Sequence, residues 1–586
     1  MVTVSRLILK IVTFSLCVSM LFTPSSLNTA RAEVKENTEM KYSDIEARGV
    51  WHRPNSSGRE TNLEGICSVL DEMASAGINM VFVETFYHGM TVFKTNLVPY
   101  YSGFENYDYG EYPDYLSAFS TEAYKRGIEV HAWVESFYLG VNESTPLVKY
   151  FPDWLLLNEK GSIRHTTEGA SLGGYIFFDP ANADAREYLV KFYDELLTRV
   201  PYVAGLNLDY IRYPVSDFYS GTDSGYTDVA ISEFSEKYGI SVNDSSQYRE
   251  FKQQISEKSL VDEWIEYRAD KVTSFIGEVS QMVRSKHKSS IISVAVHPDI
   301  SGAYNQKKQD FLTWVEKGYI DVVTPMVYYY ESSQISSALK TMLKKFDGVY
   351  CYAGLYTTYH DQSTSELDSH IGASESAGTD GFVLFESVKT FYNPSYDYVG
   401  SLSDKYKDRT PSALPHWDSE RLIGASSDII ADKLTAAGVD AQTVASVVDR
   451  LKSIAEIGEG SAESFNTVIE QLTALRDTEL FAAVGDECAS TVKATLDQLI
   501  ECIEVRGKRL SFRGYAENTE EPGDGPTEEP TDDPKEPTDD GDGTDASTPQ
   551  MPSDEAPGER TLIDIIRMIF DRIADWFKKV FGKHSD

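Results

Sequence analysis

The sequence predicts an α/β fold: a (β/α)₈ TIM barrel with enlarged loops, followed by a small all-α bundle, a disordered acidic linker and a C-terminal amphipathic helix. Eight short apolar runs rich in β-branched residues recur over residues 45–410, and each but the last is followed by helical sequence. Uninterrupted alternation of this kind is typical of a parallel sheet, and eight such units can close into a barrel. The alternative is a doubly wound open sheet, but no glycine-rich phosphate loop follows the first run.

The strands and helices of this barrel follow from apolar periodicity. The strand-like runs lie at residues 47–51, 79–84, 129–135, 205–209, 291–297, 320–329, 349–356 and 381–386. Helices with apolar residues at helical spacing lie at residues 62–76, near 116–126, at 183–199 and at roughly 259–285. Gly77 and Gly127 follow the first two helices and are expected to end them.

The composition changes beyond Pro415. Residues 417–515 are rich in Ala, Leu and Val and nearly free of Pro, which predicts three or four helices packed as a small bundle. Residues 516–559 hold 16 acidic residues, one Lys and eight Pro, a composition that predicts an extended, self-repelling linker. Residues 560–583 form a sharply amphipathic helix pattern whose apolar runs are interrupted by charges, so this helix cannot span a bilayer. We expect it to bind a membrane interface or an anchoring protein; folding back or self-association is the alternative.

The N-terminus and the overall charge limit the setting of the protein. Arg6 and Lys10 accompany an apolar stretch over residues 7–22, and Ala30-Arg31-Ala32 matches a cleavage site. We therefore expect a signal peptide over residues 1–32 and a secreted protein that can associate with the cell surface; an uncleaved anchor is the alternative. The net charge of −38 argues against nucleic acid as a partner, because phosphate binding needs a basic surface.

Acidic and aromatic residues recur where the predicted strands end, which is where barrels place their active sites. Converging carboxylates and aromatic rings suit the cleavage of a glycosidic bond, which needs one carboxylic acid and one carboxylate. Asp209 is the predicted essential carboxylate, because it ends a run too apolar to tolerate an unpaired acid. Glu135 and Glu386 are the first candidates for its catalytic partner, with Glu84 behind them. The residues expected to shape the sugar site are Glu84, His131, Trp133, Arg212 and Tyr328.

Other chemistries fit the sequence less well. Residues 169–173, Gly-Ala-Ser-Leu-Gly, match the nucleophile elbow of serine hydrolases, but no strand precedes them and no helix follows. The sequence has neither a His-Glu-x-x-His motif nor a Cys-x-x-Cys pair, which argues against a zinc hydrolase. We therefore expect no cofactor and no catalytic metal. Whether Cys488 and Cys502 form a disulfide is left open.

Several motifs resemble one known family. They are Arg48-Gly49-Val50-Trp51, Glu129-Val130-His131-Ala132-Trp133, Asp179-Pro180-Ala181-Asn182-Ala183, the run from Gly205 to Pro214 and Thr324-Pro325-Met326-Val327-Tyr328. Together they are similar to the glycosyl hydrolase-like 10 group over about residues 45–406. The fourth-strand motif, which contains Asp209, is the most specific of them.

The resemblance implies a (β/α)₈ barrel of a kind often found in secreted bacterial proteins. It also implies hydrolysis of glycosidic bonds, with cell-wall glycan among the substrates. Tyr210 stands where many members have a second acid, and Glu135 stands where members often have Asn, so the partner of Asp209 and the stereochemistry stay open. A carbohydrate-binding or scaffold protein that has lost turnover is the alternative function.

Overall fold

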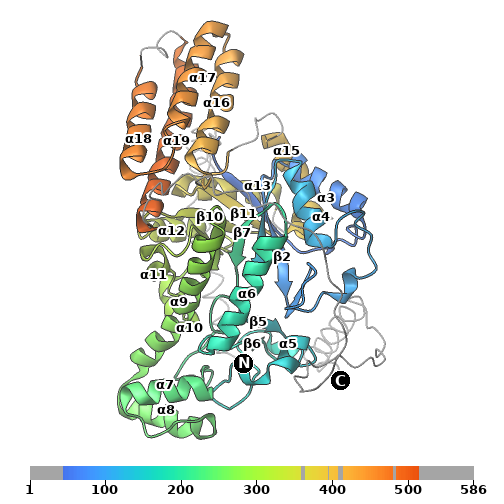
Figure 1. Ribbon diagram of the computed structural model, residues 1–586, viewed down its shortest axis with the longest axis vertical. Helices are drawn as coiled ribbons and strands as arrows, with labels where there is room; N and C mark the ends of the chain where they lie inside the picture. Colours follow the sequence, from blue (N-terminus) through green and yellow to red (C-terminus); the bar gives the residue numbers. More distant parts are fainter. Residues whose placement is uncertain (1–43, 358–362, 394, 407–412, 479–483, 514–586) are drawn as a thin grey trace, which may run out of the picture. The chain divides into compact units, whose positions relative to one another are not determined.

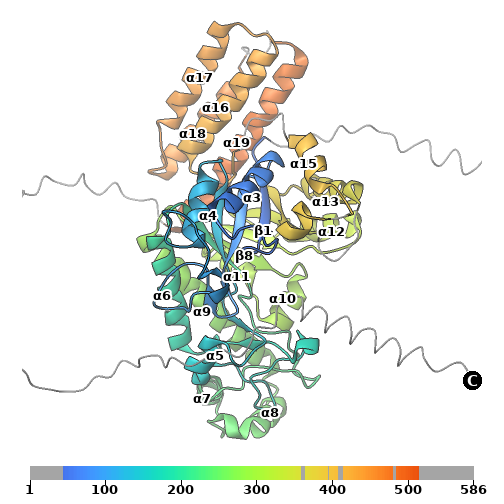
Figure 2. The ribbon, with the colours of Figure 1, turned by 90° about the vertical axis from the view of Figure 1, so that its right-hand side faces the viewer.

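Eight parallel strands close into a barrel in the computed structural model, which describes residues 44–357, 363–393, 395–406, 413–478 and 484–513 (Figures 1 and 2). The first strand pairs with both the second and the last, and each other strand pairs with its neighbours in the order β2-β4-β7-β8-β9-β10-β11. This closure confirms the predicted barrel and excludes the open sheet.

The barrel strands coincide with the eight predicted runs. They are β1 (Ala47–His52), β2 (Met80–Tyr87), β4 (Glu129–Val134), β7 (Val203–Leu208), β8 (Ile291–Val296), β9 (Val322–Pro325), β10 (Tyr350–Tyr356) and β11 (Gly381–Phe385). In the part of the chain that the structure describes, three short strands lie outside this set: β3 (Met90–Thr91) pairs antiparallel with β2, and β5 (Tyr138–Gly140) pairs with β6 (Ile176–Phe177).

Helices surround the barrel (Figures 1 and 2). They are α3 (Leu63–Ser75), α4 (Tyr115–Tyr124), α5 (Pro146–Tyr150), α6 (Ala183–Arg199), α9 (Val261–Lys286), α10 (Ile300–Lys307), α11 (Phe311–Glu316), α12 (Ser332–Leu343), α13 (Thr364–Ala377), α14 (Ser387–Phe391) and α15 (Tyr398–Tyr406). Side chains of Asn62, Asp114 and Asn182 cap the first turns of α3, α4 and α6 by accepting backbone N–H bonds. The motif at residues 179–183 is therefore the turn that begins α6.

Alternation along β4 shows how the strands divide their side chains between two cores. Val130, Ala132 and Val134 belong to the large apolar core beneath the surrounding helices. Trp133 belongs to a second core, which also contains Trp51 and Phe82 from inside the barrel. Because side chains alternate along a strand, Glu129, His131, Trp133 and Glu135 all belong to the inward-facing series of β4.

Four helices form the predicted bundle: α16 (Ser419–Ala436), α17 (Ala441–Ala455), α18 (Ala462–Arg476) and α19 (Asp486–Arg513). Its apolar residues share one core with the barrel interior. Contacts with the barrel occur at the N-terminal ends of the strands, which we call the floor: the Tyr350 hydroxyl donates to the Cys502 carbonyl at 3.0 Å, and Arg509 pairs with Asp321. The bundle thus closes the barrel at the floor, opposite the C-terminal strand ends, which we call the rim.

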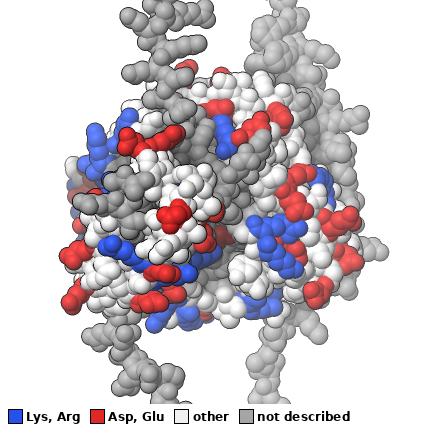
Figure 3. Space-filling view, turned by 90° about the horizontal axis from the view of Figure 1, so that it is seen from above, with Lys and Arg blue, Asp and Glu red and all other residues white. Residues whose placement is uncertain are grey.

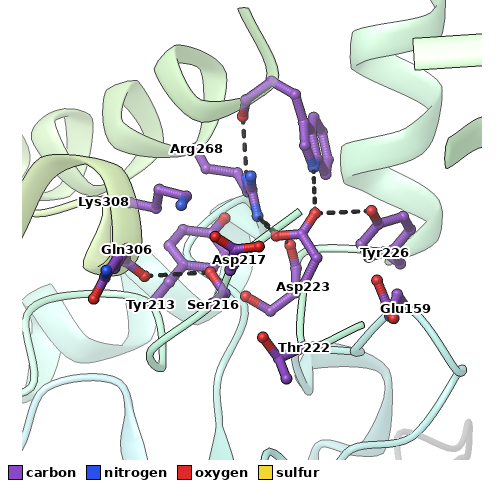
Figure 4. Close-up of polar contacts among 12 residues, drawn as sticks. Glu159, Tyr213, Ser216, Asp217, Thr222, Asp223, Tyr226, Arg268, Gln306 and Lys308 are labelled. Atoms are coloured by element: carbon purple, nitrogen blue, oxygen red, sulfur yellow. Dashed lines mark hydrogen bonds and ion pairs between the residues drawn. The ribbon is translucent and has the colours of Figure 1, made fainter. Parts of the chain in front are cut away.

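An insertion after β7 forms a small helical unit at the rim side. It contains α7 (Asp228–Tyr238) and α8 (Tyr248–Glu257), which pack on the first part of α9 around their own apolar core. Asp223 and Arg268 form a fully buried ion pair there at 2.6 Å, and Tyr226 and Trp264 donate to the same carboxylate (Figure 4). The hydrogen bonds from these donors help to offset the free-energy cost of burying the charge of Asp223.

On the face viewed in Figure 3, acidic and basic side chains are interspersed, so the negative excess does not gather there in one patch. No helix within the described ranges is long and apolar enough to cross a membrane. Cys67, Cys351, Cys488 and Cys502 are free thiols, so Cys488 and Cys502 are not bonded. The predicted signal peptide, acidic linker and final amphipathic helix lie outside the described residues.

Candidate active site

Four carboxyl groups stand at the rim, at or just after the ends of strands in one part of the barrel. Glu84 is near the end of β2, Glu135 follows β4, Asp209 follows β7 and Glu386 follows β11. The strands β2, β4 and β7 are neighbours in the sheet, and β11 is joined to β2 through β1. The topology therefore brings together the acids predicted from the strand ends.

Asp209 is held by two hydrogen bonds. The indole Nε1 of Trp133 donates to Oδ2 at 3.1 Å, and the backbone N–H of Tyr210 donates to Oδ1 at 2.7 Å. Tyr210 has φ of +46°, a conformation that is uncommon for a residue with a side chain. Asp209 is partly exposed. Burial raises its pKa, while these hydrogen bonds and the charge of Arg212 lower it, and the net pKa lies above the usual value.

Glu84 and Glu135 form a buried pair of carboxyls beside Asp209. Their exposed fractions are 4% and 2%. Burial and the charges of Glu386 and Asp209 raise the pKa of Glu84 to about 7, against the opposing effect of Arg53. Burial and the charge of Glu84 raise the pKa of Glu135 well above its usual range. Two neighbouring carboxylates in a buried site repel each other, so the doubly charged form of this pair is disfavoured.

Arg53 lies among the acids and was not singled out in the sequence. Its guanidinium pairs with Glu84 at 3.2 Å and lies over the ring of Trp133, 5.1 Å from the centroid. Burial lowers the pKa of Arg53, but the charges of Glu84 and Glu135 together with its other neighbours raise it by more, so the net pKa lies above the usual value. The sequence did hold a signal: Arg53 directly follows β1, at the one strand end where no candidate was sought.

Glu386 is a third neighbour of Arg53 at this rim. It is 6% exposed, and burial raises its pKa, while the positive charge of Arg53 lowers it. Glu386 also raises the pKa of Glu84, which indicates that the two carboxyls lie close together. The structure therefore places all four predicted acids in one electrostatic cluster.

Aromatic rings line two sides of the cluster. Tyr328 is partly exposed and packs on Tyr356 and Phe385, with ring centroids 4.7 and 5.7 Å away. On the other side Tyr138 and Tyr210 stack at 4.6 Å. Rings in such positions can stack on the apolar faces of sugars. Tyr328 thus lies on the rim beside Phe385, and its role in shaping the sugar site stays a prediction.

Two predicted substrate-binding residues do not face the acids freely: His131 lies away from them, and Arg212 is paired with another side chain. His131 is two positions before Trp133 on β4, and its Nε2 contacts Glu129 at 3.1 Å near the floor, so the structure does not bring it to the rim. Arg212 is at the rim, but it forms a bidentate pair with Glu168 at 2.8 and 2.9 Å. Arg212 thus fastens the loop that carries Glu168, and its remaining influence on Asp209 is electrostatic.

The structure does not support the esterase alternative. Ser171 lies in an exposed single turn of 3₁₀ helix, η3 (Ala170–Leu172), between glycines in the left-handed conformation. A nucleophile elbow needs a strand before the serine and an α-helix after it, and neither adjoins this turn. Within the described residues, the one group of His, Cys, Asp or Glu spaced to hold a metal contains Glu129, His131 and His416 at the floor, away from this rim.

Comparison with known proteins agrees with the geometry. The sequence profile of the glycosyl hydrolase-like 10 family matches residues 46–355, more than half of the 586 residues. The chain belongs to the glycosyl hydrolase-like 10 family. Membership in this family supports a glycosidase-type function, and the matched residues contain Asp209, Glu84 and Glu135.

Glycosyl hydrolases of two bacteria are among the relatives of this family member. It is 22% identical to the glycosyl hydrolase DigH of Escherichia coli K12 over 340 residues, which are 52% of this chain and 71% of DigH. It is also 22% identical to the glycosyl hydrolase YngK of Bacillus subtilis 168 over 325 residues, 49% of this chain and 55% of YngK.

Solved structures similar to this glycosyl hydrolase-like 10 protein include two sugar-cleaving enzymes. The catalytic domain of a β-amylase from Paenibacillus polymyxa has a TM-score of 0.42 and 12% identity, covering 63% of this chain and 99% of that one. The β-galactosidase Gan42B from G. stearothermophilus has a TM-score of 0.41 and 12% identity, covering 64% of this chain and 58% of that one.

Proposed function

We propose that this protein is a glycoside hydrolase that cleaves glycosidic bonds in a polysaccharide or cell-wall glycan, with Asp209 as the essential carboxylate. The observation that carries the proposal is the partly exposed Asp209 carboxylate, held by two hydrogen bonds, beside the buried Glu84 and Glu135, whose pKa values burial raises. Glycoside hydrolysis needs this combination of one ionised and one protonated carboxyl group. Unequal exposure and hydrogen bonding support this division of the two states.

Asp209 is suited to the ionised role. Both of its oxygens accept hydrogen bonds, from Trp133 and from the Tyr210 backbone, and these bonds stabilise the charged form. In the reaction the carboxylate either attacks the anomeric carbon or removes a proton from the attacking water. The anomeric configuration of the first product distinguishes these two roles.

The pair of Glu84 and Glu135 is suited to the acid role. A carboxylic acid with a pKa of about 7, as for Glu84, is still largely protonated just below neutral pH and can give its proton to the leaving glycosidic oxygen. This assignment moves Glu84 ahead of Glu386, because the charge of Asp209 is among the causes that raise the pKa of Glu84 and is not among those given for Glu386. Arg53 keeps the cluster from accumulating uncompensated negative charge.

Localisation belongs to the same proposal. The signal-like residues 1–32 support export, and the amphipathic residues 560–583 support attachment to a membrane interface or an anchoring partner at the cell surface. The acidic, Pro-rich composition of residues 516–559 supports a linker between the bundle and residues 560–583.

The decisive experiment is a product assay on peptidoglycan, host glycans and plant glycans, with the purified protein and its Asp209→Asn variant side by side. New reducing ends should form on at least one glycan with the wild-type protein and not with the variant. Binding without product formation across the panel would favour the carbohydrate-binding alternative.

A further inference from the structure

Two imidazoles and a carboxylate converge at the barrel floor. His131 Nε2 lies 3.1 Å from Glu129 Oε1, and His416 Nε2 lies 2.6 Å from the same oxygen. The three candidate ligand atoms all lie within 4.8 Å of one another. The exposed fractions are 1% for His131 and 2% for His416, and 10% for the Glu129 side chain. Such a cluster, at the boundary between barrel and bundle, plays no part in the rim chemistry.

The backbone and the surrounding hydrogen bonds fix these three side chains. Glu129 and His131 are two residues apart on β4 and therefore face the same way, while His416 lies in the segment that leads into α16. The Tyr352 hydroxyl lies 2.6 Å from His416 Nδ1, and Trp417 Nε1 donates to Glu129 Oε2 at 2.9 Å. These contacts occupy the outer atoms of His416 and Glu129 and turn Nε2 and Oε1 toward the centre of the cluster.

We propose that Glu129, His131 and His416 bind a divalent transition-metal ion of the zinc class, which fastens the helical bundle to the barrel floor. Imidazole nitrogens with one carboxylate oxygen form a ligand set that zinc and its neighbours favour, and a water molecule completes four-coordination. The hydrogen bond between His416 Nδ1 and Tyr352 matches the outer-sphere support that orients metal-bound histidines.

The role of this ion is structural. Glu129 begins β4 and Glu135 follows its end, so the two lie roughly 20 Å apart at about 3.3 Å per residue along the strand. Glu129 and His131 come from the barrel and His416 from the connection to the bundle, so one ion joins segments that are distant in the sequence. Without the ion, the same imidazoles donate hydrogen bonds directly to Glu129, and the join depends on those bonds alone.

Metal uptake by the full chain tests the proposal. Protein stripped with EDTA should bind one Zn²⁺ per chain in calorimetric titration, and Zn²⁺ should raise its melting temperature because it binds the folded state. His416→Gln should lose this uptake and the thermal shift. His370→Gln is the matched control: His370 is also 2% exposed and bonds to a backbone carbonyl, that of Tyr330, but it is remote from the cluster. This variant should behave like the wild type.

Failure of the wild-type protein to bind Zn²⁺ or Co²⁺, with an unchanged melting temperature, would overturn the proposal and leave a hydrogen-bonded cluster. Uptake that survives His416→Gln would overturn it as well. If that variant does not fold, X-ray absorption of the metal-loaded wild type decides: scattering from two imidazoles supports the site, and one or none rejects it. Activity on glycans is not the readout, so this test stands apart from the proposed hydrolysis.

Discussion

The indole of Trp133 donates a 3.1 Å hydrogen bond to Asp209, which joins a fully buried side chain inside the barrel to the partly exposed carboxylate at the rim. Trp133 lies in register with Glu84 on the neighbouring strand, and the guanidinium of Arg53 lies over its ring. One tryptophan thus contacts the proposed nucleophile or base and the cation that balances the buried acids. The position of Asp209 is set by the packing of the barrel interior rather than by a free loop.

Replacing Asp209 with Asn should abolish turnover while preserving the fold. We expect a fall in kcat/KM of about 10³-fold or more, because the amide can neither attack the anomeric carbon nor accept a proton. The free energy of unfolding should change by about 1 kcal/mol or less, since one accepted hydrogen bond is lost while repulsion with the glutamates is relieved. Product formation and thermal unfolding measured on the same preparation check both parts.

Asp299 supplies the matched control for this variant. It is an exposed acid just beyond the end of β8, and it is not among the main causes of the pKa shifts of Asp209, Glu84 and Glu135. Asp299→Asn should keep near wild-type activity. Near wild-type turnover of Asp209→Asn on a confirmed substrate would remove Asp209 from the mechanism.

The general acid should be found in the Glu84 and Glu135 pair rather than at Glu386. Changing the true acid to Gln should lower turnover of natural glycans by roughly 10²–10⁴-fold, the usual contribution of general acid catalysis. The same variant should retain most of its activity on an aryl glycoside whose leaving group departs without protonation. We expect this selective loss in Glu84→Gln or Glu135→Gln and a milder, unselective loss in Glu386→Gln. Selective loss in Glu386→Gln alone would reverse the assignment.

The pH profile should be bell-shaped with its optimum below neutrality. The alkaline limb follows the acid: as pH rises through about 7, Glu84 loses its proton, and kcat/KM should then fall about tenfold per pH unit. The acidic limb follows Asp209, whose pKa lies above its usual value, so activity is lost as falling pH protonates it. Initial rates from pH 3 to about 9 on one substrate check this. A profile that stays flat up to pH 9 would exclude Glu84 as the acid.

Much of this site follows from the sequence by topology alone. Apolar runs with β-branched residues predict the strand ends. In a parallel barrel the C-terminal strand ends share one rim, so the sequence alone groups Asp209, Glu135 and Glu386. The placement of His131 could not be predicted in this way. It has the same inward-facing periodicity as Trp133, and only its distance from the strand end, one layer further down, puts it with Glu129 near the floor.

Long-range partners also escape the sequence. Glu168 lies in a loop 44 positions before Arg212 and pairs with it. No sequence pattern at either residue predicts this ion pair. The sequence predicts the helices of the bundle. It does not predict which helix faces pack against the barrel, so the core that bundle and barrel share could not be foreseen. His416 was overlooked for the same reason, because its neighbours Glu129 and Tyr352 are distant along the chain.

Arg53 should tune the pH profile. Its positive charge lowers the pKa of Glu84, Glu135 and Glu386, so its removal should raise all three pKa values further. In Arg53→Gln we therefore expect the alkaline limb of kcat/KM to move to higher pH and the maximal rate to fall. Arg164, which pairs with Glu143 in an exposed loop, provides the control, and Arg164→Gln should leave the profile in place. An unmoved limb in Arg53→Gln would show that the cluster does not set that limb.

Two truncations should separate the bundle from the tail. A chain that ends after residue 516 keeps all four bundle helices, since α19 ends at Arg513, and should retain the fold and full activity on soluble glycans. A chain that ends after residue 416 loses the helices that cover the floor, so buried barrel residues such as Tyr350 and Tyr352 meet water, and Asp321 loses Arg509. We expect this shorter chain to be insoluble, because exposed apolar surface of this kind drives association.

The chain that ends after residue 516 also tests the proposed anchor. If residues 560–583 hold the enzyme at a membrane interface or on an anchoring protein, the chain ending after 516 should move from the cell-bound fraction to the medium, with unchanged specific activity. A variant with Asp in place of Trp576 and Phe577 in the full chain is the finer probe, because two charges on the apolar face should release the protein as the truncation does. Equal partitioning of the truncated and full-length proteins would show that this segment is not an anchor.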